Sequence, residues 1–220
     1  MARTIAKDHD EKRAALLKTA AGFFAENGYD RASMSQLAKE CGVSKALIYH
    51  YYESKDALLF DIVHVHLSEL VEAVEAIPPA ASPQAGLYAL TEAILATYRD
   101  ADAEHKVQLD AISALPEDQQ RVLKDMQRRL VAIMADTIRA TAPALFIERP
   151  ELLKPAAMSA FGMLNWFYMW HREGSGLDRE AYAAMIADFI LGGLQRIAEG
   201  KAETLDTPAT ASIRQGSPFR

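Results

Sequence analysis

The 220-residue sequence contains a single cysteine, Cys41, which excludes an intramolecular disulfide and a zinc site built from several thiolates. It has no uninterrupted apolar run of the roughly 18–20 residues that a membrane-spanning helix requires. Its charged first residues do not resemble a signal peptide. These absences predict a cytoplasmic protein that does not enter a membrane.

Recognised catalytic patterns are also missing, including the phosphate-binding loop, Gly-x-Gly-x-x-Gly and Gly-x-Ser-x-Gly. His64 and His66 would point about 200° apart on a helix, so they cannot easily share a metal ion. His64 could instead approach His105 inside a helical bundle, although a lone histidine is more often a core residue. We therefore predict that the protein is not an enzyme and has no catalytic residue, metal site or cofactor.

The pattern of apolar residues is helical, and runs of alternating β-branched residues are missing. Residues 9–27 have the period of an amphipathic helix, with Ala14, Leu17, Ala21 and Phe24 at spacings of three and four residues. Prolines and glycines separate several later segments. The expected helices span residues 9–27, 34–41, 45–51, 54–77, 84–101, 104–114, 117–141, 150–173 and 178–199. These nine helices predict an all-α fold.

Residues 33–55 predict two short helices joined by a tight turn. Ser33 and Gln36 match a capping box, in which each side chain accepts a hydrogen bond from a free backbone amide. Gly42 follows the first helix, where a left-handed backbone is favoured. Ser44 is a suitable N-cap for the second helix. A helix-turn-helix of this kind places its second helix in the DNA major groove.

Polar and aromatic side chains on and around this second helix are able to reach phosphates or base edges. Leu47, Ile48 and Tyr52 supply its apolar side. The candidate DNA-binding residues are Arg31, Ser33, Ser35, Ser44, Lys45, Ala46, Tyr49, His50, Tyr51 and Lys55.

The charge distribution agrees with a DNA-binding segment near the N-terminus. The chain has a formal net charge of −6. Residues 1–60 contain nine Lys/Arg and eight Asp/Glu, a net of +1, whereas residues 61–220 contain the other 15 and 22, a net of −7. The small positive balance predicts modest non-specific DNA affinity and a strong dependence on dimerisation.

Residues 9–60 resemble the N-terminal domain of TetR-family transcriptional repressors. The matching pieces are Leu16–Phe24, Gly28-Tyr29, Ser33, Leu37-Ala38, Cys41–Lys45, Tyr49, Tyr52 and Ser54–Leu59. Leu47 stands where the family often has threonine, and Tyr51 where it often has histidine, so the operator sequence cannot be taken from a relative. Together with the helix pattern, the resemblance implies a helix-turn-helix domain over residues 1–53. An effector-binding and dimerisation domain over residues 54–200 and a flexible tail over residues 201–220 would follow.

The resemblance further implies a ligand-responsive repressor that binds a palindromic double-stranded DNA operator as a homodimer. Residues 156–170 are apolar almost all round, and Gly192-Gly193 allow close approach of another helix. In the family, the helices expected at 150–173 and 178–199 would form the dimer interface. The alternative is that their apolar faces only fill the core of one chain.

A small lipophilic effector would release such a repressor from DNA. The candidate effector-binding residues are Met126, Arg129, Met163, Asn165, Trp166 and Trp170. Residues 161–172 are weakly similar to acyl-CoA-responsive members of the family, which implies an acyl-CoA or aryl-CoA thioester. A free aromatic or other lipophilic compound is the main competitor. The alternative function is an all-helical lipid carrier or enzyme that does not bind DNA.

Overall fold

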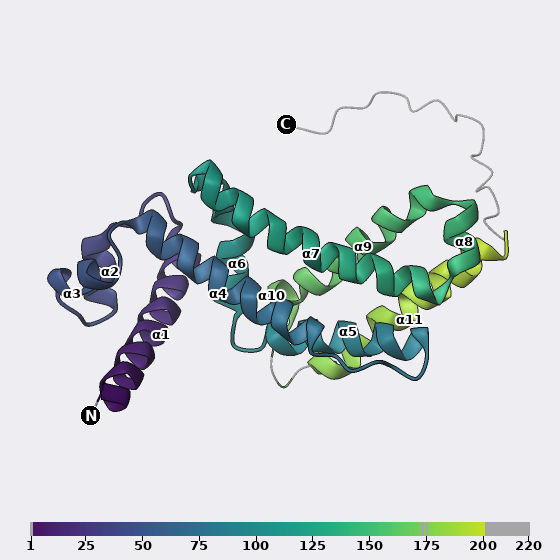
Figure 1. The fold of residues 1–220 in the computed structure, drawn as a ribbon, viewed down its shortest axis with the longest axis horizontal. Coiled ribbons are helices and arrows are strands. Elements are labelled where there is room, and N and C mark those ends of the chain that lie inside the picture. Colours follow the sequence, from purple (N-terminus) through teal and green to yellow (C-terminus); the bar gives the residue numbers. More distant parts are fainter. Residues whose placement is uncertain (1, 173, 175, 201–220) are drawn as a thin grey trace, which may run out of the picture.

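The computed structural model describes residues 2–172, 174 and 176–200, and it confirms the expected all-α fold. Figure 1 shows a small N-terminal head joined by one long helix to a larger bundle. The α helices are α1 Ala2–Asn27, α2 Met34–Glu40, α3 Lys45–Tyr51, α4 Lys55–Glu75, α5 Pro83–Thr97, α6 Asp102–Ala111, α7 Glu117–Thr141, α8 Pro143–Glu148, α9 Leu153–Asn165, α10 Phe167–Trp170 and α11 Arg179–Ala198. Short 3-10 helices span η1 Ile112–Ala114 and η2 Pro150–Leu152. The tail expected over residues 201–220 lies outside the described residues.

The head is formed by α1, α2 and α3, and its local geometry follows the capping signals. Ser33 and Gln36 form both hydrogen bonds of the capping box at the start of α2. Gly42 has φ of +65°, which a glycine adopts without steric cost. The two short helices are held together by completely buried apolar side chains, among them Leu37 and Ile48.

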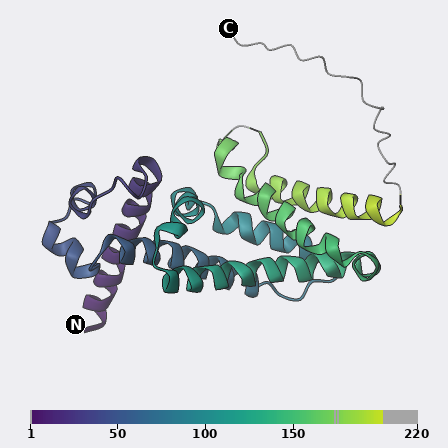
Figure 2. The ribbon, with the colours of Figure 1, turned by 90° about the horizontal axis from the view of Figure 1, so that it is seen from above.

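Helix α4 belongs to both parts of the molecule. The Ser54 hydroxyl caps it by accepting a hydrogen bond of 3.0 Å from the Ala57 amide. The helix packs against α1 of the head and against α5, α6 and α7 of the bundle. Figures 1 and 2 show it leaving the head and running along the bundle without a break. One continuous helix therefore links the head to the bundle.

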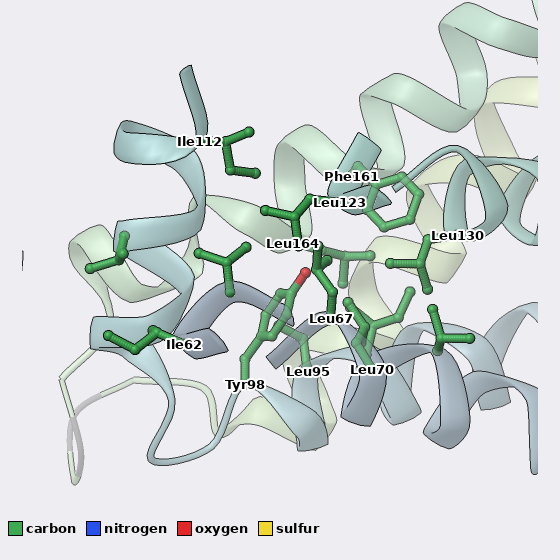
Figure 3. Close-up of a cluster of buried hydrophobic side chains, with 14 of the residues drawn as sticks. Ile62, Leu67, Leu70, Leu95, Tyr98, Ile112, Leu123, Leu130, Phe161 and Leu164 are labelled. Carbon is green, nitrogen blue, oxygen red and sulfur yellow. The ribbon is translucent and has the colours of Figure 1, made fainter. Parts of the chain in front are cut away.

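The bundle has an apolar core to which widely separated segments contribute. Figure 3 shows Leu67 and Leu70 of α4 near Leu95 of α5 and Tyr98, the C-cap of that helix, with residues of α7 and α9 opposite them. Among the described residues, no helix has both the length and the apolar character needed to cross a membrane.

The structure corrects two helix boundaries in the second half of the chain. Pro143 begins the additional helix α8, because proline fits the first turn of a helix, where its missing N–H is not needed. The helix expected over 150–173 is divided into η2, α9 and α10. The break falls at Trp166, and the following residue, Phe167, is buried with its ring 4.9 Å from that of Tyr182.

Two histidines lie buried where α4, α5 and α6 meet. His66, and not the expected His64, approaches His105, with ring centroids 5.8 Å apart. The Tyr98 ring lies 4.2 Å from His105. Burial is the main cause that lowers the pKa of His66 to about 3 and that of His105 to about 4. Both side chains are therefore neutral near pH 7.

We expect the free energy of unfolding to fall as the pH is lowered from about 7 to about 5. Histidines of the unfolded chain take up protons near their ordinary pKa of 6.5, whereas the folded pair binds them only near 3 and 4. Urea unfolding across this range measures the slope. His66→Phe removes two buried ring nitrogens that have no hydrogen-bond partner and should make the slope shallower. An unchanged slope in His66→Phe would show that buried His66 does not contribute to the pH dependence of stability.

Candidate nucleic-acid interface and ligand cavity

Helix α3 has one face in the head and one in solvent. Ile48 and Tyr52 are buried, which fixes the rotation of the helix about its axis. Lys45, Ala46, Tyr49 and His50 are exposed as a result. The Lys45 ammonium lies 5.8 Å from the centre of the Tyr49 ring, so a cation and an aromatic ring occupy the same outer surface. Such a surface can contact both phosphates and base edges.

The serines of the candidate set lie at the starts of the two short helices. The Ser44 hydroxyl accepts a hydrogen bond of 3.1 Å from the Leu47 amide, so it is the N-cap of α3. Ser33 caps α2 in the same way, and Ser35 is exposed in its first turn. Helix starts of this kind present free backbone amides that favour a phosphate.

Tyr51 and Leu47, the two departures from the family pattern, lie in different environments. Tyr51 is half-buried, with its ring 4.8 Å from His9 of α1 and 5.7 Å from His50. Leu47 is exposed on the outer part of α3. Tyr51 thus contributes to packing α3 on α1, while Leu47 lines a shallow hollow together with Leu16 of α1 and Val43.

Lys55 is bound within the head, whereas Arg31 is exposed to solvent. The Lys55 ammonium donates hydrogen bonds to the carbonyls of Tyr29 and Ala32, at 2.8 and 3.1 Å. It also lies 4.1 Å from the centre of the Tyr29 ring. Lys55 therefore holds the α1–α2 connection against α4, and this geometry does not support the expected role at DNA. Arg31 is exposed at the same connection.

A carboxylate on α4 anchors the head, and the sequence contains no local signal for it. Asp61 accepts a hydrogen bond from the Tyr52 hydroxyl after α3 and forms an ion pair of 2.5 Å with Arg13 of α1. Tyr29 donates to Asp56, one turn earlier on α4. Residues far apart in the sequence thereby fix α1 and α3 to one end of α4.

A cavity of about 540 Å³ opens between α4, α6, α7 and α9 of the bundle and Tyr98, the C-cap of α5. Its apolar lining consists of Leu70, Leu109, Leu130, Val131, Met158 and Phe161. Polar lining residues include Tyr98, Gln108 and Asn165, and the Tyr98 hydroxyl donates a hydrogen bond of 2.9 Å to Asn165 Oδ1. The size and the mostly apolar lining are those of a small-molecule site.

Asn165 is the one residue of the six effector candidates that lines this cavity. Met126 and Met163 are partly buried against the core, and Arg129 is paired with Glu75. Trp166 and Trp170 are not among the residues that line this cavity, and they are 58% and 50% exposed. Their expected effector role therefore stays a prediction that this cavity does not support.

The sequence analysis missed most of the cavity because its lining comes from four helices and from Tyr98 at the end of α5. Lys124 and Arg128 of α7 and Lys154 of α9 are exposed residues at its mouth. Gln108 is buried on α6. The sequence shows only a glutamine on a helix of mixed polarity. Its place in the cavity lining becomes visible once the helices are packed.

The exposed side of α11 has an unusual composition. The Phe189 side chain is 60% exposed, and Gly192 and Gly193 lie one turn further along the same face. A Cβ atom added at either glycine would meet no atom within 4 Å. Gly162 on α9 is also exposed and equally open. Flat, apolar helix faces of this type allow another helix to approach closely.

Comparisons with known proteins define the class. Residues 16–62 match the model of bacterial regulatory proteins of the tetR family, and residues 80–194 match the tetracyclin repressor-like C-terminal domain. The chain belongs to the TetR family of DNA-binding transcriptional regulators.

Individual relatives are similar to this chain over most of its length. A TetR-family regulator from Bordetella parapertussis 12822 is 30% identical with a TM-score of 0.76, covering 81% of this chain and 93% of that one. BetI from Rhizobium meliloti is 28% identical over 194 residues, covering 86% of this chain and 93% of the relative. AibR, solved with isovaleryl coenzyme A and operator DNA, shares the fold with 24% identity and a TM-score of 0.68, covering 82% and 98%.

We expect Asp61→Ala to lower the free energy of unfolding by about 1–3 kcal/mol, because the buried Tyr52 hydroxyl loses its acceptor. Arg13→Ala should cost less than about 1 kcal/mol, since that side chain is substantially exposed. Urea unfolding followed by circular dichroism compares the variants. If the two substitutions lowered the free energy of unfolding equally, the ion pair, and not the Tyr52 hydrogen bond, would be the contact of Asp61 that stabilises the head.

Proposed function

We propose that this protein is a repressor that binds a palindromic operator as a homodimer and is released by a small lipophilic effector. The observation that carries the proposal is the exposed surface of α3, where Lys45, Tyr49 and His50 lie on a helix whose opposite side is anchored by Ile48 and Tyr52. The remaining candidate contacts are Arg31, Ser33, Ser35, Ser44, Ala46 and Tyr51.

The proposed dimer forms through the exposed faces of α9 and α11. Phe189 and the Gly192-Gly193 pair supply apolar area and close approach on α11, and Gly162 supplies it on α9. A two-fold axis through this surface would present two copies of α3 to DNA. Adjacent major grooves on one face of the duplex are one turn, about 34–36 Å, apart.

The proposed effector site is the cavity of the bundle, and α6 connects it to the head. Gln108 of α6 lines the cavity, while Lys106 donates a hydrogen bond of 2.7 Å to the Ala25 carbonyl near the end of α1. Lys18 of α1 also forms an ion pair of 3.3 Å with Glu104 of α6. A ligand that displaces α6 would therefore pull on α1.

A second connection runs through aromatic and polar contacts to α4. His105 Nε2 donates to the Asn165 carbonyl at 3.2 Å, and its ring packs on Tyr98 and faces His66 of α4. In the proposed mechanism, the effector shifts α4 and α6 and changes the separation of the two α3 helices. A coupling of about 1–3 kcal/mol gives a 5–150-fold loss of DNA affinity.

An acyl-CoA or aryl-CoA thioester is one chemistry that fits this cavity. Its acyl part would occupy the apolar lining, and its phosphates would lie near Lys124, Arg128 and Lys154. The fold is able to hold such a ligand, since AibR was solved with isovaleryl coenzyme A. A free aromatic or other lipophilic compound would use the same apolar lining without CoA phosphates.

We expect Tyr49→Ala to weaken binding to intergenic DNA beside the gene at least tenfold, because each subunit loses an exposed contact of α3. Gel shifts at low and moderate salt measure this, and sedimentation checks that the dimer remains. Val122→Ala, an exposed apolar residue of α7, is the control and should bind as the wild type does. Wild-type protein that binds no such DNA specifically would refute the repressor assignment and favour a carrier or enzyme.

We expect Gly193→Glu to convert the dimer to monomers. Within one chain the substitution has open space and improves helix propensity by up to about 1 kcal/mol, so the folded monomer should be retained. In the proposed interface it would bury a charge. Light scattering gives the mass of the particle, and Ala140→Glu on the exposed side of α7 is the matched control. A Gly193→Glu protein that stays dimeric would place the interface elsewhere.

A further inference from the structure

The mouth of the bundle cavity is positively charged although the surrounding domain is acidic. Residues 61–220 have a net charge of −7, yet the residues that line this cavity include Lys124, Arg128 and Lys154 and no Asp or Glu. Arg128 is paired with Asp125 at 2.5 Å, and Lys124 donates to the Gln120 side chain at 2.7 Å. Both partners lie outside the cavity lining, so an anion at the mouth would share Arg128 with Asp125 and would also lie near Lys124 and Lys154.

The inner end of the cavity has a different polar character. Gln108 is only 7% exposed, and its Oε1 atom has no hydrogen-bond partner among the described residues. The Tyr98 hydroxyl donates its hydrogen to Asn165 Oδ1, so its oxygen can still accept a hydrogen bond. Figure 3 shows this hydroxyl pointing into the apolar cluster. The buried end therefore offers hydrogen-bond acceptors that lack a donor.

Six apolar residues complete the lining of the cavity. They are Leu70, Leu109, Leu130, Val131, Met158 and Phe161. Leu109 and Met158 are exposed at the mouth, whereas Leu70, Leu130 and Phe161 are buried further inside. The cavity thus combines exposed cations, apolar side chains and buried acceptors without a donor.

We propose that the effector is an amphiphile with an anionic group at one end and a hydrogen-bond donor, a hydroxyl or N–H, at the other end of an apolar segment. Gln108 is the residue that selects for the donor, and the three cations select for the anion. Either a carboxylate or the phosphates of a CoA thioester could pair with the cations at the mouth. This inference rests on the proposed function in one respect, namely that the cavity is the effector site.

The selection against a ligand without the donor follows from the cost of unpaired polar groups. A plain alkyl end would seal Gln108 Oε1 from water without replacing its hydrogen bond, which costs more than a missing apolar contact. A donor at the same place supplies the bond. The glutamine therefore discriminates between ligands of almost equal shape, which the apolar lining does not.

The test compares ω-hydroxydecanoate, decanoate and decanol by calorimetry with the full-length protein. We expect ω-hydroxydecanoate to bind about tenfold more tightly than decanoate, and Gln108→Leu to remove that preference by improving decanoate binding. Lys154→Met should weaken both acids severalfold and leave decanol unchanged. Gln195→Leu, on the exposed side of α11, is the control for Gln108→Leu. Equal affinities of the two acids for the wild type would overturn the proposal.

The CoA thioesters of the two acids form a second arm that identifies the source of the anion. Tighter binding of ω-hydroxydecanoyl-CoA than of the free hydroxy acid assigns the cations to CoA phosphates, and the reverse order assigns them to a carboxylate. A gel shift with the same compounds separates this inference from the function on which it rests. Acids that bind with the expected preference but never release DNA would refute the effector role of the cavity. Release by both acids alike would refute only the selection by Gln108.

Discussion

The continuity of α4 is the constraint on which the rest of the structure depends. Its first turns hold the head through Lys55, Asp56 and Asp61, and its later turns place His66 and Leu70 in the bundle. A helix with intact i→i−4 hydrogen bonds moves as a rigid element. The orientation of α3 is therefore tied to the packing of α4 among α5, α6 and α7. Because the head is fixed to one end of α4 and the cavity lies beside the other end, the proposed mechanism lets a small repacking beside the cavity change the position of α3.

The polar groups buried in the bundle lower the stability of the fold. His66, Tyr98, His105 and Gln108 lie where apolar residues of similar size would give a more stable bundle. Several of their ring or amide atoms have no partner among the described residues. Tyr98 and Gln108 line the cavity itself, and His105 lies between them and His66 of α4. In the proposed mechanism, these polar contacts carry a shift from the cavity to α4.

The features that could be predicted from the sequence are those decided by neighbouring residues. Caps at Ser33 and Ser44 and the left-handed Gly42 fix the helix-turn-helix within a dozen residues, so the reading of α2 and α3 is confirmed. Pro143 was ambiguous, because proline both ends a preceding helix and begins a new one. The use of Lys55 depends on carbonyls about 25 residues away. The cavity depends on the packing of four helices and the end of α5, so apolar composition pointed to Trp166 although the lining residues are elsewhere.

The weak positive charge of the head sets the conditions under which the proposed repressor can be specific. Residues 1–60 carry a net charge of +1, and the rest of the chain is acidic, so attraction to DNA of arbitrary sequence is small. Lys55 contributes still less because its ammonium is bound within the head. Affinity must then come from base contacts of α3 and from the simultaneous docking of two heads. Because both heads must fit at once, a modest change in their separation removes most of the binding, and the effector needs only a small free energy to release the DNA.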